Sequence, residues 1–150
     1  MKKVLLYGVL GIIVLAVLIQ LIPYGHDRTN PPVRSEPAWP DSQSRALAQR
    51  ACFDCHSNQT IWPWYSNLAP VFWLVYGDVM EGRRRLNFSD WNRSEGQYAD
   101  ELKEVHYERN MPPANYLLLH PGARLSETEW KRLYSALEAI TASYQQPISP

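Results

Sequence analysis

The sequence predicts an all-α fold, in which one N-terminal apolar helix precedes a small helical domain. Beyond Asp41, apolar residues recur at the three- and four-residue spacing of amphipathic helices. Two segments carry the pattern of a helix capping box, with Ser followed three residues later by Glu or Gln. Asn-Gly and Asp-Gly turns, which are strong signals of β-hairpins, do not occur. The 150 residues are enough for one domain of ordinary size, an anchor and a linker.

Residues 4–22 form an apolar run without a charged residue. As a helix this run would be about 28 Å long, close to the roughly 30 Å hydrocarbon core of a bilayer. Lys2 and Lys3 precede it, and the next basic residue is Arg28, so the positive-inside rule keeps the N-terminus in the cytoplasm. A cleaved signal peptide is the alternative, but the run is longer than a usual signal core and no small-x-small cleavage site follows it. We expect residues 1–22 to be an uncleaved single-pass anchor in a bacterial inner membrane, with the remaining chain in the periplasm.

A proline-rich segment follows the anchor. Five prolines lie between residues 23 and 40, among small and polar residues, and this composition favours extended backbone over helix. We therefore expect residues 23–42 to form a semi-rigid stalk, residues 43–146 to form the folded domain, and residues 147–150 to be a tail.

The first two helices expected in the folded domain flank its cysteines. The first covers residues 43–52 and delivers the cysteines at its end. The second begins with Asn67 as its N-cap, carries Pro70 in its first turn and ends near Gly82 or Arg83. Its expected apolar stripe consists of Leu68, Phe72, Val75 and Val79.

Capping boxes begin the third and fourth expected helices. The third opens at Ser94 and stops at Asn110, ahead of two prolines. The fourth opens at Ser126, where Leu125 and Trp130 occupy the two positions of a hydrophobic staple. Its expected buried stripe consists of Trp130, Leu133, Leu137 and Ile140.

Charge and cysteine content exclude two classes of protein. Fifteen basic and fifteen acidic residues balance, and no long block has one sign, so the chain lacks the basic surface that binds nucleic acid. The two cysteines lie three positions apart, which provides no disulfide framework for a small secreted domain.

The cysteines belong to the sequence Cys52-Phe53-Asp54-Cys55-His56, which has the spacing of a haem-attachment motif. In such a motif two thiols add to the haem vinyl groups and the adjacent imidazole coordinates iron. The motif predicts one covalent haem c per chain, with Cys52 and Cys55 as attachment residues and His56 as the proximal ligand. A thioredoxin-like dithiol would need a βαβ frame, and a zinc site would need further ligands at the usual spacing; the sequence offers neither.

The second axial ligand is expected to be Met111. It lies in Asn110-Met111-Pro112-Pro113, where prolines can hold a thioether with little conformational freedom. His106 and His120 are the alternatives. The other ring nitrogen of His56 is expected to donate to a carbonyl, for which Pro63 and Pro70 are candidates.

Two further groups of residues allow contacts with a haem. Trp62, Trp64 and Tyr65 could pack against a porphyrin or donate to its propionates, although ordinary aromatic core packing is an equal alternative. The run Arg83-Arg84-Arg85 is expected to be a solvated helix C-terminus that interacts with the helix dipole. The alternative is that one arginine neutralises a propionate, or that the run meets an acidic partner.

Together these motifs resemble the bacterial haem-binding domain family of cytochrome-c-like proteins. The resemblance rests on the segments 52–58, Trp62-Pro63-Trp64-Tyr65-Ser66-Asn67, Met111-Pro112-Pro113 and Leu119-His120-Pro121 ahead of Leu125-Ser126. It implies a small cytochrome-c-like helical domain around one haem, with His56 and Met111 as candidate axial ligands.

The function expected from these features is single-electron transfer by a membrane-anchored periplasmic cytochrome. Its partners would be redox proteins at or near the membrane and the bilayer itself, and it would not be an enzyme. The alternative is a haem-based sensor or small-ligand-binding module, in which the sixth ligand is absent or displaceable. Peroxidase activity would need an open iron position with acid–base help, so at most a weak activity is expected.

Overall fold

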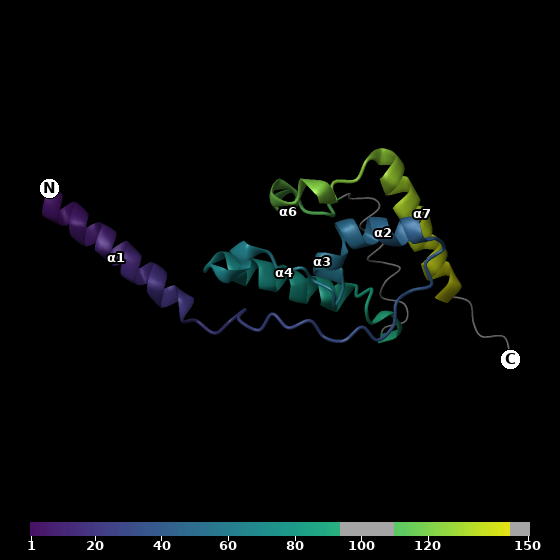
Figure 1. Ribbon diagram of the computed structural model, residues 1–150, viewed down its shortest axis with the longest axis horizontal. Helices are drawn as coiled ribbons and strands as arrows, with labels where there is room; N and C mark the ends of the chain where they lie inside the picture. The colour runs from purple at the N-terminus through teal and green to yellow at the C-terminus, as the bar shows by residue number, and fades with distance from the viewer. Residues whose placement is uncertain (94–109, 145–150) are drawn as a thin grey trace. The chain divides into compact units, whose positions relative to one another are not determined.

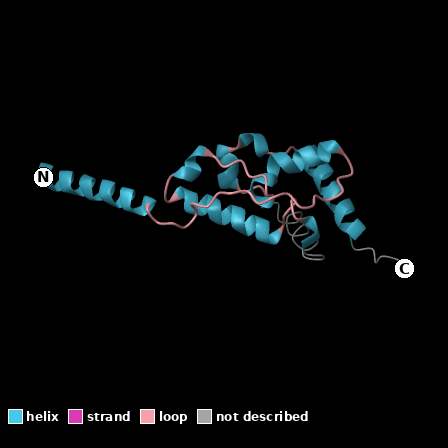
Figure 2. Cartoon of the chain, turned by 60° about the horizontal axis from the view of Figure 1, so that its bottom comes forward, coloured by secondary structure: helices cyan, strands magenta, loops and turns pink. Residues whose placement is uncertain are grey.

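The computed structural model is all-helical in the part of the chain that it describes, residues 1–93 and 110–144, which confirms the predicted fold class. Figures 1 and 2 show helices and loops there, and one isolated bridge joins Ser35 to Asp90. The α-helices are α1 (Lys2–Gln20), α2 (Ser42–Ala51), α3 (Phe53–His56), α4 (Val71–Arg85), α6 (Ala114–Leu119) and α7 (Glu127–Tyr144). The 3₁₀ helices are η1 (Trp64–Asn67), η2 (Trp91–Arg93) and η3 (Pro121–Ala123).

The chain divides into two compact units. Unit 1 consists of Met1–Thr29 and Ile61–Asp78, and unit 2 consists of Asn30–Thr60 and Val79–Pro150. Helix α4 contributes its first half to unit 1 and its second half to unit 2.

Helix α1 of unit 1 is long and apolar enough to cross a membrane, and it is the one helix with these properties in the described residues. Its nineteen residues have a mean hydropathy of 2.3, and none is buried in the protein. It begins and ends two residues earlier than the expected span.

Helix α4 begins later than predicted. Asn67 is the last residue of η1 and its amide donates to the carbonyl of Trp64, so it does not cap α4. Leu68 has extended backbone, with φ −116° and ψ 120°, which keeps the helix from starting before Val71. Of the expected stripe, Phe72 and Val79 are buried, Val75 is half-buried and Leu68 is exposed.

The core of unit 2 is built from α2, α3, the segment after α4, and α7. Phe88 is fully buried and stacks against Phe53, with ring centroids 5.4 Å apart, and against Trp91 at 5.7 Å. Burying such rings provides the largest apolar areas in a small domain. The cluster is completed by Leu47, Ala48, Leu86, Trp130, Leu133, Leu137 and Ile140.

The capping box and buried stripe of α7 are confirmed. The Ser126 hydroxyl accepts from the N–H of Glu129 at 3.3 Å, and the Glu129 carboxylate accepts from the N–H of Ser126 at 2.8 Å. The four expected stripe residues are all buried. Helix α6 was not predicted, and the expected helix from Ser94, with His106, lies outside the described residues.

Residues 30–40, in the segment for which the sequence predicts a stalk, belong to unit 2 and contact other parts of it along much of their length. The N–H groups of Arg34 and Ser35 donate to the carbonyl of Ser89 at 2.8 and 3.2 Å. The Asn58 amide donates to the carbonyl of Pro32 at 2.9 Å, and the ring of Trp39 lies 5.4 Å from that of Phe88. This segment therefore forms part of the unit that carries the cysteine motif.

Candidate haem-attachment site

The cysteine motif forms a single helical turn at the end of α2. Cys52 ends α2 and precedes α3, and its carbonyl accepts from the N–H groups of Cys55 and His56 at 3.2 and 2.8 Å. Phe53 is buried in the core of unit 2, whereas both cysteines and His56 are half-buried. The turn is thus fixed to the core through its second residue, and its three chemically active residues lie closer to the surface.

The imidazole of His56 is oriented by α4. Its Nδ1 lies 3.0 Å from the carbonyl oxygen of Gly82 and 3.2 Å from that of Leu86. Carbonyls accept hydrogen bonds and cannot donate them, so Nδ1 carries the proton and Nε2 is the nitrogen that can coordinate a metal. The predicted acceptors Pro63 and Pro70 were wrong, because Gly82 in α4 and Leu86, the residue after α4, supply the two carbonyls.

Gly82 allows α4 to approach the motif closely. A Cβ atom built at this position would lie 2.5 Å from the carbonyl oxygen of Cys55 and 3.1 Å from its Cβ. No side chain larger than hydrogen fits there without a backbone shift. Gly82 therefore allows the contact between α4 and the motif. The sequence predicts that the helix ends near Gly82 or Arg83, but α4 continues to Arg85.

Arg83 holds the loop that follows His56. Its side chain is 7% exposed, and its guanidinium donates to the Ser57 carbonyl at 2.8 Å, to Asn30 Oδ1 at 2.7 Å and to Thr60 Oγ1 at 2.9 Å. The expectation of a solvated arginine run was wrong for this residue. Arg84 and Arg85 are exposed, and both pair with Glu81.

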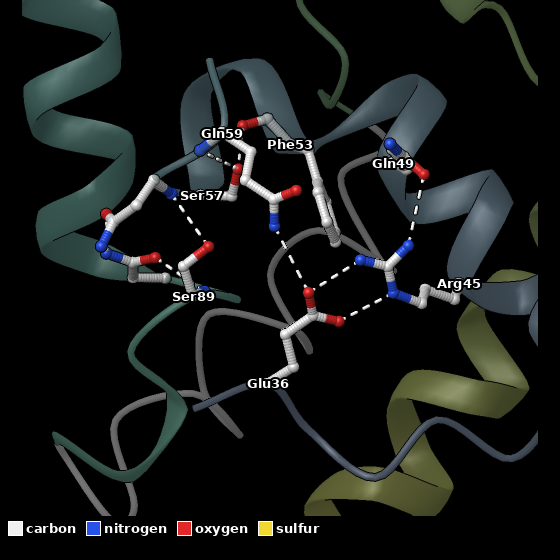
Figure 3. A network of polar contacts seen from close by, with 9 residues as sticks. Glu36, Arg45, Gln49, Phe53, Ser57, Gln59 and Ser89 are labelled. Atoms are coloured by element: carbon white, nitrogen blue, oxygen red, sulfur yellow. Dashed lines mark hydrogen bonds and ion pairs between the residues drawn. The ribbon is translucent and has the colours of Figure 1, made fainter. Parts of the chain in front are cut away.

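A polar network completes the support of this loop (Figure 3). The Ser57 hydroxyl donates to the Phe53 carbonyl at 2.7 Å and accepts from the N–H of Gln59 at 2.9 Å. The Gln59 amide donates to Glu36 at 3.3 Å, and Arg45 donates to both oxygens of that carboxylate at 2.7 Å. Hydrogen bonding from Arg45 lowers the pKa of Glu36, which keeps the carboxylate charged.

Cys52 and Cys55 are not joined in a disulfide. Burial raises the pKa of the Cys52 thiol to about 12, with a smaller contribution from the charge of Cys55. A dithiol that acts in disulfide exchange needs an attacking thiol with a lowered pKa. The environment of Cys52 has the opposite effect, and this disfavours the thioredoxin-like alternative.

A hydrogen bond connects helix α6 to the motif. The hydroxyl of Tyr116 donates to Oδ2 of Asp54, inside the motif, at 2.7 Å. Met111 lies three residues before α6, in a loop, and is 37% exposed. The bond thus tethers the helix that follows the Met111 loop to the turn that carries His56.

His120 lies at the other end of α6 and packs on Tyr116. Their rings stack with centroids 4.2 Å apart, and Nδ1 of His120 lies 3.2 Å from the carbonyl oxygen of Tyr116. His106 lies outside the described residues. The positions of Met111 and His120 do not decide among Met111, His106 and His120 as the second axial ligand, so Met111 stays the predicted ligand.

The three aromatic residues proposed to contact the haem belong to unit 1, whereas the motif belongs to unit 2. The indole N–H of Trp62 is buried and has no acceptor in the described part of the chain. Trp64 is exposed, and its ring meets that of Tyr65 edge to face at 5.8 Å. Contacts between these rings and a porphyrin stay predictions.

Comparison with known proteins gives one match. The model of the haem-binding domain family matches residues 14–139. No curated protein and no solved structure matches the chain. The matched region contains the cysteine motif, the α4 residues that orient His56, and the Met111 loop, and it spans most of the 150 residues. The chain belongs to the haem-binding domain family.

Proposed function

We propose that this protein carries single electrons as a monohaem c-type cytochrome. The proposal is supported above all by the geometry of His56, which follows two cysteines in one turn and has Nδ1 bound to the carbonyls of Gly82 and Leu86. A metal-binding histidine typically donates its second N–H to such an acceptor, which fixes the ring and raises the basicity of the coordinating nitrogen.

The residues of the motif fit a covalently bound haem. Each thiol of Cys52 and Cys55 would add across one vinyl group, with its sulfur bonding to one vinyl carbon and its hydrogen going to the other. Bound haem supplies an iron that changes between the ferrous and ferric states. The chain itself holds the proximal ligand through Gly82 and Leu86, and fixes the loop after it through Arg83.

Met111 is the proposed second axial ligand. A thioether ligand opposite histidine raises the reduction potential relative to two histidines. The bond from Tyr116 to Asp54 supports this assignment, because it holds α6 against the motif and so limits how far the preceding loop can move. His106 and His120 are the alternative ligands.

We further propose that α1 anchors the protein in a bacterial inner membrane, with the N-terminus in the cytoplasm and the haem domain in the periplasm. Support comes from the length and hydropathy of α1 and from Lys2 and Lys3 before it. An anchored carrier has a high effective concentration near redox partners in the same membrane. Those partners are the proposed donors and acceptors of its electron.

Replacement of Met111 tests the electron-transfer proposal. In Met111→Ala, the ferric protein should lose the sulfur-to-iron charge-transfer band and gain affinity for carbon monoxide in its ferrous form. Met80→Ala, on an exposed part of α4, is the matched control and should keep the band. A wild-type protein that is high-spin and binds carbon monoxide avidly would contradict electron transfer and support a haem-based sensor.

A further inference from the structure

Unit 1 is almost free of charged residues outside its two ends. Of the thirty charged residues in the chain, five fall in unit 1, namely Lys2, Lys3, Asp27, Arg28 and Asp78. Residues 4–26 and 61–77 contain no Asp, Glu, Lys or Arg. The first of these segments is mainly the apolar helix α1, but the second belongs to the folded part of the chain.

Several apolar side chains of the second segment face outward. Five large apolar side chains exposed within fourteen residues of a folded segment are unusual on a soluble monomer and indicate an interaction surface. We call this set the apolar rim of unit 1; it consists of Ile61 (80% exposed), Trp64 (76%), Leu68 (50%), Val71 (38%) and Leu74 (69%).

The apolar rim is joined directly to the end of α1. The side-chain amide of Gln20, the last residue of α1, accepts from the N–H of Ala69 at 3.1 Å and donates to its carbonyl at 3.5 Å. Leu68 is the immediate neighbour of Ala69, and Val71 begins α4 two residues later. Leu68, a residue of the rim, is therefore next in sequence to the residue that is hydrogen-bonded to the end of α1.

The chain after α1 turns back onto the same segment. Gly25 has φ +82°, and a Cβ atom there would lie 2.9 Å from the ring of Phe72. The ring of Tyr24 meets that of Tyr76 edge to face at 5.4 Å, and Arg28 donates to the Ser66 carbonyl. These contacts fix α1 to the folded segment without a flexible spacer.

The dimensions of a bilayer indicate the depth at which the apolar rim lies relative to the hydrocarbon core. With Lys2 and Lys3 at the cytoplasmic surface, residues 4–20 of α1 are about 26 Å long and nearly fill a hydrocarbon core of about 30 Å, so Gln20 lies close to the far edge of the core. The interfacial layer beyond that edge is about 5–8 Å thick. Because Ala69 is hydrogen-bonded to Gln20, Leu68 and Val71 fall inside this layer. Tryptophan is enriched at this depth, which suits the exposed ring of Trp64.

We propose that the apolar rim of unit 1 is a second membrane-contact surface, which inserts into the interfacial layer of the bilayer that holds α1. The folded segment then rests on the membrane surface instead of hanging from it on a stalk. This inference rests on the membrane anchor put forward under the proposed function, but it is independent of haem and of the axial ligands.

Photo-crosslinking of the full-length protein in phospholipid vesicles tests the rim. One vesicle sample would contain a phospholipid with a photoactivatable group near its headgroup, to label the interfacial layer, and a second would carry the group in the acyl chain, to label α1. Adducts would be mapped by mass spectrometry. Peptides covering residues 61–74 should be labelled several-fold more than the α6 peptide that contains Leu118, which is 80% exposed and equally apolar. The haem spectrum, recorded on the same sample, reports the state of the haem site separately.

The double variant Leu68→Glu/Leu74→Glu should lose the adducts in residues 61–74 and keep those in α1. The matched variant Leu118→Glu/Leu119→Glu, which adds the same charge to exposed positions of α6, should leave the rim adducts unchanged. Adducts confined to α1 in the wild-type protein would contradict membrane contact by the apolar rim and would still support the membrane anchor. An absence of adducts in both regions would overturn the anchor as well.

Discussion

Gly82 is the residue through which α4 approaches the cysteine motif, since its carbonyl accepts from His56 and its missing side chain admits Cys55. In Gly82→Ala, the new methyl group would force the backbone of the motif and α4 apart. We expect a loss of about 1–3 kcal/mol in the free energy of unfolding. We also expect less haem incorporated per chain, because the two carbonyls move away from Nδ1. Urea unfolding and the haem-to-protein absorbance ratio measure the two effects.

Gly77→Ala is the control for this change, because it makes the same substitution one and a half turns earlier in α4. The nearest atom to a Cβ at Gly77 is the hydroxyl of Tyr24, at 3.7 Å, which is an ordinary contact. Alanine favours a helix interior over glycine by up to about 1 kcal/mol, so this variant should be as stable as the wild type or more so. Equal stability of the two variants would contradict the close approach.

Arg83→Met should destabilise unit 2, because it removes the donor for the Ser57 carbonyl, Asn30 and Thr60. Buried acceptors left without a donor cost about 2 kcal/mol or more. Arg84→Met loses the same charge from an exposed pair with Glu81 and should change stability by less than about 0.5 kcal/mol. Chemical denaturation of both variants measures their free energies of unfolding relative to the wild type. Similar losses in the two variants would show that charge alone matters.

At the residue scale, the sequence predicted the attachment motif and missed its supports. The spacing of Cys52, Cys55 and His56 is local, and any helical turn satisfies it. The role of Gly82 depends on α4 crossing a motif 26 residues away, which spacing does not encode. Arg83 and Arg84 are identical neighbours, and a rotation of about 100° per residue around the helix decides which is buried.

At the element scale, the hydrogen bond from Tyr116 to Asp54 links α6 to α3. Tyr116→Phe removes the hydroxyl and keeps a ring that can stack on His120. If Met111 coordinates the iron, a looser α6 should let imidazole displace it several-fold faster, as followed in the visible spectrum of the ferric protein. Asp54→Ala should have the same effect, and the double variant should add nothing further, since both changes break one bond. Additive effects would contradict a direct coupling.

The capping box of α7 predicts an acid-sensitive helix start. The backbone N–H of Ser126, followed by Arg50, lowers the pKa of Glu129 from 4.5 to about 2. The lower folded-state pKa means that Glu129 stabilises the fold above pH 4.5, and that this contribution is lost as the pH falls towards 2. Glu129→Gln should therefore reduce the difference in urea midpoint between about pH 6 and about pH 3. An unchanged difference in Glu129→Gln would contradict this role of the capping box.

Local signals explain which elements could be predicted. Helices α2 and α7 have side-chain caps at their starts, Asp41 and Ser126, and their predicted and observed boundaries agree closely. Helix α6 has six residues, no side-chain cap and no buried residue, so it leaves no pattern in the sequence. Helix α4 starts at Val71 because the extended Leu68 separates it from η1, and this depends on the backbone and not on the apolar stripe.

At the scale of the whole molecule, the two units differ in their content of charged residues. The sequence shows this difference as two stretches without charged residues, 4–26 and 61–77. The second stretch was interpreted as haem walls and core. Composition predicts a semi-rigid stalk for residues 23–42, because prolines indicate local backbone preference and carry no information about contacts. The partners of Pro32, Arg34 and Ser35 within unit 2, Asn58 and Ser89, lie far from them in the sequence.

The central claim is that this chain holds one covalent haem through the turn that α4 supports. The most direct measurement is acid–acetone extraction of the protein produced together with the c-type maturation machinery. The wild-type protein should keep its haem through extraction, and Cys52→Ala/Cys55→Ala should release it. Haem that washes out of the wild type, or stays with the double variant, would contradict the claim.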